Sequence, residues 1–382
     1  MIFGIEKAGF LQTLLFSMKI LITGAAGFIG SWLASQLAKR GDEVVGIDNI
    51  NTYYDPNLKY ARLREFYGIE ADAQWGMVGA IPETGNDGRT AVTFPDMPWG
   101  RALQSTLMPN LRFVRMDIVN RDALSRLFQE EKFDKVMNLA AQAGVRYSLR
   151  NPYAYIESNV MGFMNILECC RLNNIQHLVY ASSSSIYGLN DRAPFSEDDE
   201  VIQPVSIYAA TKKSNELMAH AYGKLYGLKT TGLRYFTVYG PWGRPDMAPM
   251  LFASAISKGK EINVFNNGDL IRDFTYVDDI VNGTIQVIDH QPEISEKGVP
   301  AKVYNIGCSH PVKLMDFISE IEKNLGIMAK KNFMPMQQGD VYQTNADTTK
   351  LEREVGYCPS VRLPEGIARF VEWYQSDKNP LK

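Results

Sequence analysis

The chain has 382 residues, of which 45% are hydrophobic and 22% are charged. These values are ordinary for a soluble globular protein and exclude disorder along the whole length. Forty lysines and arginines oppose 43 aspartates and glutamates, which leaves a net charge of −3. This balance gives no electrostatic reason to expect a nucleic-acid or membrane partner. The length favours two domains, or one large fold with an appended lobe.

Residues 1–17 form the first segment of the chain and contain a short apolar run. A weak signal peptide would show such a run. We interpret the segment instead as an N-terminal extension, because Glu6 precedes the run, no small-residue cleavage site precedes Met18, and Met18 begins a complete structural unit. No run of about 20 apolar residues is present, so we expect no membrane-spanning helix.

The first structural unit starts with a short apolar run at 19–23 that predicts a strand. A glycine turn follows, then helical spacing over 28–40 that ends at Gly41, and a second apolar run over 43–47 that ends at Asp48. Strand, turn, helix and strand in this order predict one right-handed βαβ unit.

The alternation continues along the chain and predicts an α/β fold with a Rossmann-like, doubly wound parallel sheet. The further predicted strands are 111–116, 135–139, 177–181 and 229–235, and the further predicted helices are 121–131, 152–172 and 206–226. Residues of about 68–110 lack clear periodicity and are interpreted as a long insertion.

After residue 240 glycine and proline become frequent and the elements become shorter. Here the pattern predicts helices near 249–258, 278–289, 313–325 and 364–375, and a strand at 262–265. We therefore expect a Rossmann domain over 18–240 and a smaller α/β substrate-binding lobe over 241–382, with a discontinuous boundary.

The glycine turn has the spacing G-x-x-G-x-x-G at Gly24, Gly27 and Gly30. Glycine lets the backbone approach a pyrophosphate, and the following helix offers its N-terminal N–H groups to the phosphates. Spaced glycines alone are a weak signal, and a purely structural turn is the alternative. Because Asp48 ends the next strand, where a carboxylate accepts ribose hydroxyls and repels a 2′-phosphate, we predict an NAD site. The spacing departs from the G-x-G-x-x-G of simple dehydrogenases.

Tyr208 and Lys212 are four residues apart in a predicted helix and therefore share a face. Tyrosine is a poor base at neutral pH, but a nearby ammonium stabilises the phenolate and lowers its pKa. A second copy of this spacing, Tyr374 and Lys378, lies far from any cofactor motif, and we expect it to be an exposed helical pair.

Four consecutive serines, Ser182 to Ser185, follow a predicted strand. Taken alone, this run would be interpreted as a polar turn. Its position at a strand end, with Tyr208 beginning a helix beside it, favours a place in the site, because nucleotides and substrates bind at the carboxyl edge of such sheets.

The four cysteines include an adjacent pair, Cys169 and Cys170, and show no C-x-x-C spacing. This pattern favours a reduced, cytoplasmic compartment over a disulfide framework. The four histidines are scattered without ligand spacing, so we expect no metal site.

With these residues in place, the chain resembles the extended short-chain dehydrogenase/reductases, and within them the NAD-dependent nucleotide-sugar epimerases, most closely the UDP-glucuronate 4-epimerases. The resemblance covers nearly all of residues 18–375 except the insertion. The segments that carry it are TGAAGFIGSWLA, GIDNINTYYD, NLAAQAGVRYSL, YIESNVMGFMNILE, YASSSSIYG, SIYAATKK, LRYFTVYGPWGRPDMA and RDFTYVDDI.

The resemblance implies a catalytic role for three residues. Tyr208 would be the base, Lys212 would lower its pKa and bind the nicotinamide ribose, and Ser183 would bridge the sugar O4 and Tyr208. NAD would be tightly bound and recycled. The implied cofactor-binding residues are Gly24, Gly27, Phe28, Ile29, Gly30, Asp48, Asn49, Asp117, Ile118, Leu139, Ala140, Ala141, Gln142, Asn159, Tyr208 and Lys212.

The resemblance also implies a UDP-sugar substrate and a homodimer formed through the helices over 152–172 and 206–226. Ser184, Ser185 and Thr237 would hold the substrate carboxylate, Arg272 the diphosphate and Asp340 the uridine ribose. The implied substrate-binding residues are Ser183, Ser184, Ser185, Arg146, Thr237, Arg244, Phe265, Arg272 and Asp340.

Ser184 and Ser185 bear on the reaction. Related 4,6-dehydratases carry Asp-Glu at these two places, and UDP-glucuronate decarboxylases carry Glu at the second. Without an acidic side chain the site lacks a base for a C5 proton, the group that eliminating water would require. The reaction that the resemblance implies is interconversion of UDP-glucuronate and UDP-galacturonate. The alternatives are a 4-epimerase of a neutral UDP-hexose, a UDP-glucuronate decarboxylase, and a non-catalytic NAD-binding protein.

Overall fold

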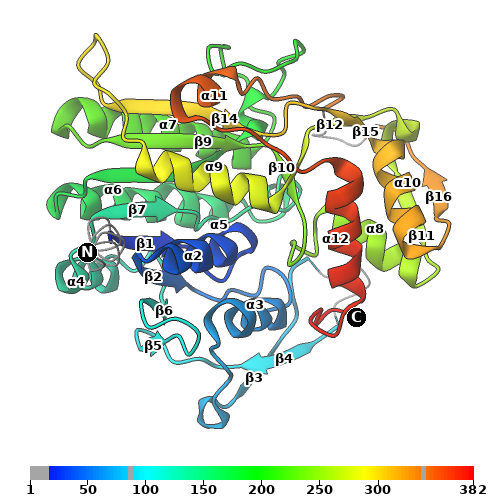
Figure 1. The fold of residues 1–382 in the computed structure, drawn as a ribbon, viewed down its shortest axis with the longest axis horizontal. Helices are drawn as coiled ribbons and strands as arrows, with labels where there is room; N and C mark the ends of the chain where they lie inside the picture. The colour runs from blue at the N-terminus through cyan, green and yellow to red at the C-terminus, as the bar shows by residue number, and fades with distance from the viewer. Residues whose placement is uncertain (1–16, 85–89, 337–340) are drawn as a thin grey trace, which may run out of the picture.

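An eight-stranded sheet forms the centre of the structure, a computed structural model that describes residues 17–84, 90–336 and 341–382 (Figure 1). Residues 1–16 of the expected N-terminal extension lie outside the described residues. The neighbouring strands pair in parallel, apart from the antiparallel pair at the edge formed by the last two. The order across the sheet is β14 (Ala301–Ile306), β9 (Thr230–Tyr235), β8 (His177–Ser183), β7 (Lys135–Asn138), β1 (Lys19–Thr23), β2 (Glu43–Asp48), β6 (Leu111–Arg115) and β5 (Ala102–Gln104).

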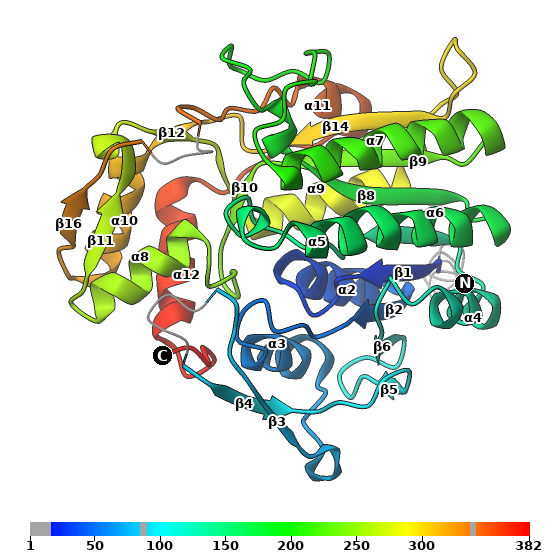
Figure 2. The same ribbon diagram turned by 180° about the vertical axis from the view of Figure 1, so that it is seen from behind.

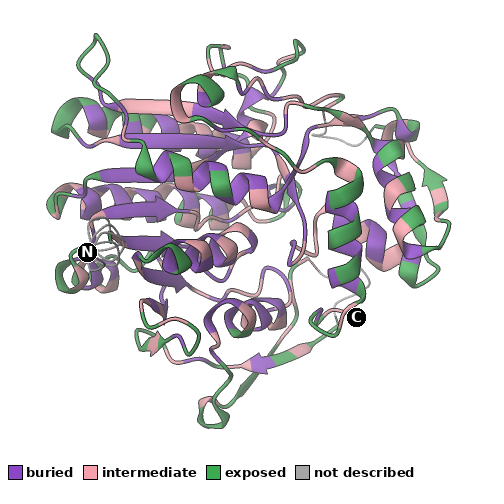
Figure 3. Ribbon diagram, viewed as in Figure 1, coloured by how far each residue is buried: buried purple, intermediate pink, exposed green. Residues whose placement is uncertain are grey.

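Helices cover both faces of this sheet, as Figures 1 and 2 show from opposite sides. The helices of one face are α2 (Phe28–Arg40), α3 (Asn57–Tyr67) and α9 (Val277–Asp289), and those of the other are α4 (Arg121–Glu131), α6 (Gly162–Leu172) and α7 (Ile207–Tyr226). Strands buried on both faces are near-continuous apolar runs, and in β1 Ile20, Leu21 and Ile22 are fully buried (Figure 3). The predicted doubly wound α/β fold is confirmed.

The predicted helix over 152–172 has an unusual middle. The structure has α5 (Pro152–Tyr155), a π-helical segment (Ile156–Met161) and then α6, in one continuous run. Hydrophobic spacing cannot reveal a π segment, because one extra residue per turn changes the pattern little over so short a length. The segment carries the buried Asn159, whose contacts are described below.

The insertion of about 68–110 contains regular structure that its sequence did not indicate. It forms a short 3₁₀ turn (Ala73–Trp75), an antiparallel hairpin of β3 (Met77–Ala80) and β4 (Val92–Pro95), and the edge strand β5. These strands are three or four residues long, and β3 is largely exposed, so the alternation of apolar and polar residues is too short to detect.

The chain after residue 240 contributes both to the large sheet and to a separate group of elements. The strand β14 is not among the strands predicted above, because its half-exposed residues and its polar Lys302 and Asn305 disguise an edge strand. It is an edge strand of the large sheet, and α9 packs on one face of that sheet, so the division of the chain at 240 stays a prediction. The remaining elements after residue 240 are α8 (Ala248–Ser257), β11 (Glu261–Val264), β12 (Ile271–Arg272), β13 (Phe274–Tyr276), β15 (Val312–Lys313), α10 (Leu314–Leu325), β16 (Lys330–Phe333), α11 (Thr349–Val355) and α12 (Leu363–Gln375). The short strand β10 (Thr237–Tyr239) comes just before residue 240.

The group of α8, α10, α12, β11 and β16 stands beside the carboxyl ends of the sheet strands (Figure 1). The shorter strands outside the large sheet form separate two-stranded pairs, which include β10 with β13, β11 with β16 and β12 with β15. In the part of the chain that the structure describes, no helix combines the length and the apolar character needed to cross a membrane.

Candidate active site

A cavity of about 380 Å³ opens where the carboxyl ends of β1, β2, β7, β8 and β9 meet. Residues predicted for the cofactor and for the substrate share its walls. The predicted residues that line it are Gly24, Gly27, Phe28, Ile29, Gly30, Asp48, Asn49, Asp117, Ile118, Leu139, Ala140, Ala141, Gln142, Ser183, Ser184, Ser185, Tyr208, Lys212, Thr237 and Arg244.

The turn between β1 and α2 forms one end of the cavity. Gly24 has a left-handed backbone with φ of +71°, and an added Cβ would lie 2.9 Å from backbone atoms of Leu139 and Ala140. A Cβ at Gly30 would lie 2.2 Å from the carbonyl oxygen of Gly24. The N-terminus of α2 receives no capping hydrogen bond from any side chain that the structure describes. Its N–H groups and its positive dipole therefore suit an anionic group.

Asp48 stands at the end of β2, as predicted, and lines the same cavity. Its Oδ1 accepts a hydrogen bond from the backbone N of Ile50 at 2.8 Å. Lys59 Nζ lies 3.3 Å from the same oxygen and 3.0 Å from Oδ1 of Asn51. The carboxylate is thus fixed by its own loop and by α3.

The three predicted catalytic residues all line the cavity. Ser206 caps α7 by accepting a hydrogen bond from the backbone N of Ala209 at 3.1 Å, and α7 presents Tyr208 and Lys212 to the cavity. Ser183 is the last residue of β8, and its Oγ donates to Oγ of Ser185 at 3.2 Å. Lys212 Nζ donates to the carbonyl oxygen of Ala181 at 2.8 Å.

The electrostatic surroundings of Tyr208 include a cation that the sequence analysis did not assign to it. Burial raises the pKa of Tyr208, whereas a hydrogen bond with Ser183 and the charge of Arg244 lower it, and the balance lies above the ordinary value. Burial lowers the pKa of Lys212 to about 8. The expected effect of Lys212 on the pKa of Tyr208 stays a prediction.

Arg244 is held on the wall of the cavity by Asp246 and Tyr53. Its Nε and Nη2 donate to the two carboxylate oxygens of Asp246 at 3.0 and 2.5 Å. Asp246 also accepts a hydrogen bond from the Tyr53 hydroxyl at 3.0 Å, and the Arg244 guanidinium lies 5.8 Å from the centre of the Tyr53 ring. Asp246 keeps Arg244 charged and oriented.

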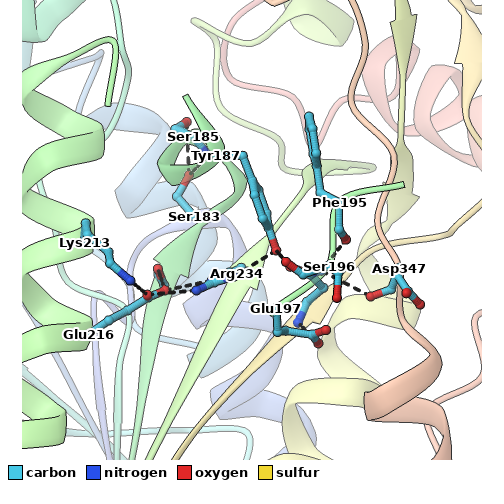
Figure 4. A network of polar contacts seen from close by, with 12 residues as sticks. Ser183, Ser185, Tyr187, Phe195, Ser196, Glu197, Lys213, Glu216, Arg234 and Asp347 are labelled. Atoms are coloured by element: carbon cyan, nitrogen blue, oxygen red, sulfur yellow. Dashed lines mark hydrogen bonds and ion pairs between the residues drawn. The ribbon is translucent and has the colours of Figure 1, made fainter. Parts of the chain in front are cut away.

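A buried network lies directly behind the serine run (Figure 4). Glu216, one turn beyond Lys212 on α7, accepts hydrogen bonds from Arg234 of β9 at 2.9 and 3.1 Å and from Ser182 Oγ at 2.7 Å. Arg234 also donates to the Tyr187 hydroxyl at 2.9 Å. Burial raises the pKa of Glu216, but the hydrogen bond and charge of Arg234 outweigh burial and lower it. The network joins α7, β8 and β9 behind Ser183.

A model of the NAD dependent epimerase/dehydratase family matches residues 20–307. The chain belongs to this family.

Individual relatives of this family are similar to the chain over almost its whole length. The CapI protein of Staphylococcus aureus is 47% identical over 94% of this chain and 98% of its own. The UDP-glucuronate 4-epimerase 4 of Arabidopsis thaliana is 43% identical over 94% of this chain and 75% of its own. The crystal structure of the UDP-glucuronic acid 4-epimerase from Bacillus cereus, in complex with UDP-glucuronic acid and NAD, has a TM-score of 0.76 and 34% identity, and covers 93% of this chain and 98% of its own.

NAD, the cofactor of this epimerase/dehydratase family, fits the residues present in the cavity. The glycine turn leaves room for a group that approaches the backbone more closely than any Cβ would allow, next to an uncapped helix N-terminus. Asp48 supplies a buried carboxylate at the position where such folds bind a ribose.

Asn159 is a predicted cofactor residue of this family that lies behind the cavity wall rather than in it. Its Oδ1 accepts from the backbone N of Gln142 at 2.8 Å, and its Nδ2 donates to the Gln142 carbonyl at 3.0 Å and to Thr211 Oγ1 at 3.1 Å. The π segment thereby fixes the backbone of Gln142, which does line the cavity.

Three of the other predicted substrate residues, Arg146, Phe265 and Arg272, do not line this cavity. Arg146 lies over the ring of Phe265, 5.5 Å from its centre, so the two meet each other elsewhere. Arg272 Nη1 donates to the carbonyl oxygens of Ile271 and Tyr342, both at 2.9 Å. Asp340 lies outside the described residues. The roles of these four residues stay predictions.

The sequence analysis missed several residues that the structure places in the wall. For the residues of the loop over 51–54 the signal was present in the segment GIDNINTYYD, which was quoted for the resemblance without a role for any residue after Asn49. The missed residues of this loop and of the following helix are Asn51, Tyr53, Tyr54 and Lys59.

The tail copy of the tyrosine and lysine spacing is not the exposed helical pair that was expected. Tyr374 is buried, with 5% of its surface exposed, because it packs into the apolar core on α12. Lys378 lies beyond the end of α12, and its Nζ is 2.7 Å from Glu65.

Among the described residues, no group of three or more His, Cys, Asp or Glu side chains is arranged to hold a metal ion.

Proposed function

We propose that this chain is a UDP-glucuronate 4-epimerase that interconverts UDP-glucuronate and UDP-galacturonate. The observation that carries the proposal is the placement of Ser183, Tyr208 and Lys212 on one cavity with the glycine turn, next to Ser184 and Ser185 where other sugar-nucleotide enzymes carry acids. The similarity to the Arabidopsis thaliana and Bacillus cereus 4-epimerases supports the same substrate.

In the proposed reaction Tyr208 removes the proton from the sugar O4, and Ser183 donates or accepts the hydrogen bond that joins O4 to the phenolic oxygen. NAD, when bound, accepts hydride from C4 and later returns it. The product of the first half is a 4-keto sugar. The hexose then turns over about its diphosphate linkage, and Tyr208 returns the proton as the opposite face is reduced. No net oxidation occurs.

The UDP portion must stay bound while the hexose turns, so most of the binding energy belongs on the nucleotide. We propose Arg272 for the diphosphate, Asp340 for the uridine ribose, and Arg146 and Phe265 as further contacts. Phe265, Arg272 and Asp340 come after residue 240 in the chain, and Arg146 lies over the ring of Phe265.

Incubation of the purified protein with UDP-glucuronate, without added NAD, tests the proposal. We expect UDP-galacturonate to form without carbon dioxide and without net NADH. Formation of a UDP-pentose alone would favour a decarboxylase. Turnover of UDP-glucose and not of UDP-glucuronate would favour a neutral-sugar epimerase, and no turnover of either would favour a non-catalytic NAD-binding protein.

The proposed 4-keto intermediate is prone to decarboxylation, and we propose that three hydroxyl groups of the cavity prevent it. A ketone at C4 with a carboxylate on C5 is a β-keto acid, which readily loses carbon dioxide. Ser184, Ser185 and Thr237 all line the cavity, and we propose that their hydroxyls hold the carboxylate away from the orientation that permits this loss.

Replacing Ser184, Ser185 and Thr237 together with alanine is expected to raise the ratio of UDP-pentose to UDP-galacturonate, since nothing would then fix the carboxylate. The ratio is measured by separating the products after partial conversion, with the wild-type protein run in parallel. A triple variant that still turns over and forms no UDP-pentose would rule out this role.

We also propose that the protein is a homodimer. Figure 2 shows α5, α6 and α7 side by side on one face of the molecule. Large apolar side chains are exposed on these elements, more than single scattered residues would require. They are Tyr153, Ile156, Met161 and Leu172 on the α5 to α6 run, and Ile207, Leu217, Leu225 and Tyr226 on α7.

Sedimentation of the purified protein is expected to give the mass of two chains, and Tyr153→Glu to give one, because the substitution places a charge in the buried contact. A monomeric wild-type protein would refute the dimer.

A cytoplasmic location stays a prediction. All four cysteines have free thiols, and Cys169, Cys170 and Cys308 are buried.

A further inference from the structure

The insertion reaches the wall of the proposed active site through two residues at the end of the β3 side of its hairpin. Thr84 donates from its backbone N and from Oγ1 to the carbonyl oxygen of Tyr53, at 3.0 and 2.8 Å. The backbone N of Glu83 donates to the carbonyl oxygen of Thr52 at 3.2 Å. The insertion thus pairs with the loop that carries Tyr53 into the cavity wall.

The hairpin is a fixed support rather than a free flap, because its other strand rests on α3. Asn57 Nδ2 donates to the carbonyl oxygen of Thr93 at 3.1 Å, and the Tyr60 hydroxyl donates to that of Pro95 at 2.5 Å. The rings of Tyr60 and Phe94 are stacked with their centres 6.5 Å apart. Pairing with such a support restricts the movement of the loop over 51–54.

The other side of Tyr53 faces the reacting groups. Its hydroxyl donates to Asp246, and its ring lies under Arg244. Its ring also lies 5.1 Å from that of Tyr147. A Cβ at Gly144 would lie 2.5 Å from the Tyr53 hydroxyl, and Gly144 has φ of +97°, so glycine at this position allows the close approach. The insertion therefore holds the backbone of Tyr53 by hydrogen bonds, and the cavity wall holds its side chain.

We propose that Thr84 is a positioning residue for the reaction: through the backbone of Tyr53 it holds Arg244 and Asp246 in place on the cavity wall, beside Tyr208. The insertion would thus act on the proposed active site, and this inference rests on the proposed function. It does so by fixing a cation, without touching the substrate.

The position of Arg244 matters because its charge lowers the pKa of Tyr208. Among the described residues, other titratable groups near Tyr208 include Lys212, one turn along α7, and Tyr155 of α5, whose ring centre lies 6.0 Å from that of Tyr208. If Arg244 moves away, the pKa of Tyr208 rises, and a larger share of the enzyme carries a protonated Tyr208 at neutral pH. The acid limb of the kcat/KM profile then moves to higher pH.

The test compares Thr84→Val, which removes the hydroxyl donor at nearly constant volume, with Thr84→Ser, which keeps it. With UDP-glucuronate at neutral pH we expect Thr84→Val to lower kcat/KM by up to about fivefold, the contribution of one hydrogen bond, and to recover toward wild type at high pH. Thr84→Ser is expected to retain the wild-type profile. Thermal unfolding of each variant is recorded in parallel.

A double-mutant cycle with Tyr53→Phe tests the route, because Tyr53→Phe removes the hydrogen bond to Asp246. We expect Thr84→Val to add little to the effect of Tyr53→Phe. Full additivity, or a Thr84→Val profile that overlies an active wild type, would overturn the inference while leaving the proposed function intact. If Thr84→Val unfolds, Thr84→Ala takes its place in the cycle. A wild type inactive on UDP-glucuronate would refute the proposed function instead.

Discussion

Replacing Tyr208 with phenylalanine is expected to lower the turnover of UDP-glucuronate by a factor of about 10² to 10⁴, the usual contribution of a positioned general base. The substitution removes the only atom of the side chain that can accept the O4 proton. The ring keeps its edge contact with Tyr155, 6.0 Å between centres, so the fold has little reason to change. Product formation is measured by separation of the two UDP-sugars, and NAD content and thermal unfolding are expected to match wild type.

Tyr374→Phe is the matched control for this substitution. It makes the same chemical change in the tail copy of the spacing, where Lys378 pairs with Glu65 rather than approaching the cavity. Its turnover is expected to equal that of wild type. Turnover of Tyr208→Phe within tenfold of wild type would mean that another group removes the proton, and the proposed mechanism would be wrong.

Replacing Glu216 with alanine is expected to lower the free energy of unfolding by about 3 to 5 kcal/mol, because it leaves a buried charge on Arg234 without its partner. Both side chains are 4% exposed, and the carboxylate also accepts hydrogen bonds from Ser182 and Lys213. The free energy is measured by urea unfolding at neutral pH. Because the pKa of Glu216 is lowered in the folded protein, its contribution is present at neutral pH and is lost as the pH falls through the folded value.

Two comparisons separate the loss of the ion pair from a general weakening. The double change Arg234→Met with Glu216→Leu removes both charges and is expected to destabilise less than Glu216→Ala alone. Glu65→Ala breaks the exposed pair with Lys378 and is expected to change the free energy of unfolding by less than about 1 kcal/mol. If Glu216→Ala and Glu65→Ala lowered the free energy of unfolding equally, the buried pair of Glu216 and Arg234 would contribute no more to stability than the exposed pair.

The parts of the fold and site that could be predicted are those written in short stretches of sequence. The glycine turn lies between an apolar run and a helical pattern, and Asp48 ends the next run, so local periodicity alone placed both at one edge of the sheet. Tyr208 and Lys212 share a face because of helix geometry. The serine run begins at the end of β8 and continues into the following turn, close to the strand end that the apolar run predicted.

The parts that could not be predicted depend on contacts between distant residues. The charge that lowers the pKa of Tyr208 comes from Arg244, and Arg244 is held by Tyr53, which is in turn held by Thr84. No spacing rule connects these positions. Asn159 gives a similar lesson, since only the π segment and the fold bring it to the backbone of Gln142.

The insertion also changes what the border of the large sheet offers to other molecules. β5, which the insertion supplies, pairs with β6 and occupies the hydrogen-bonding groups on the outer side of that strand. An uncovered strand of this kind is a template on which a second chain can add its own strand and begin to aggregate. Deleting residues 68–110 would therefore remove β5, expose the edge of β6 and favour aggregation. Single substitutions at Thr84 leave β5 paired with β6.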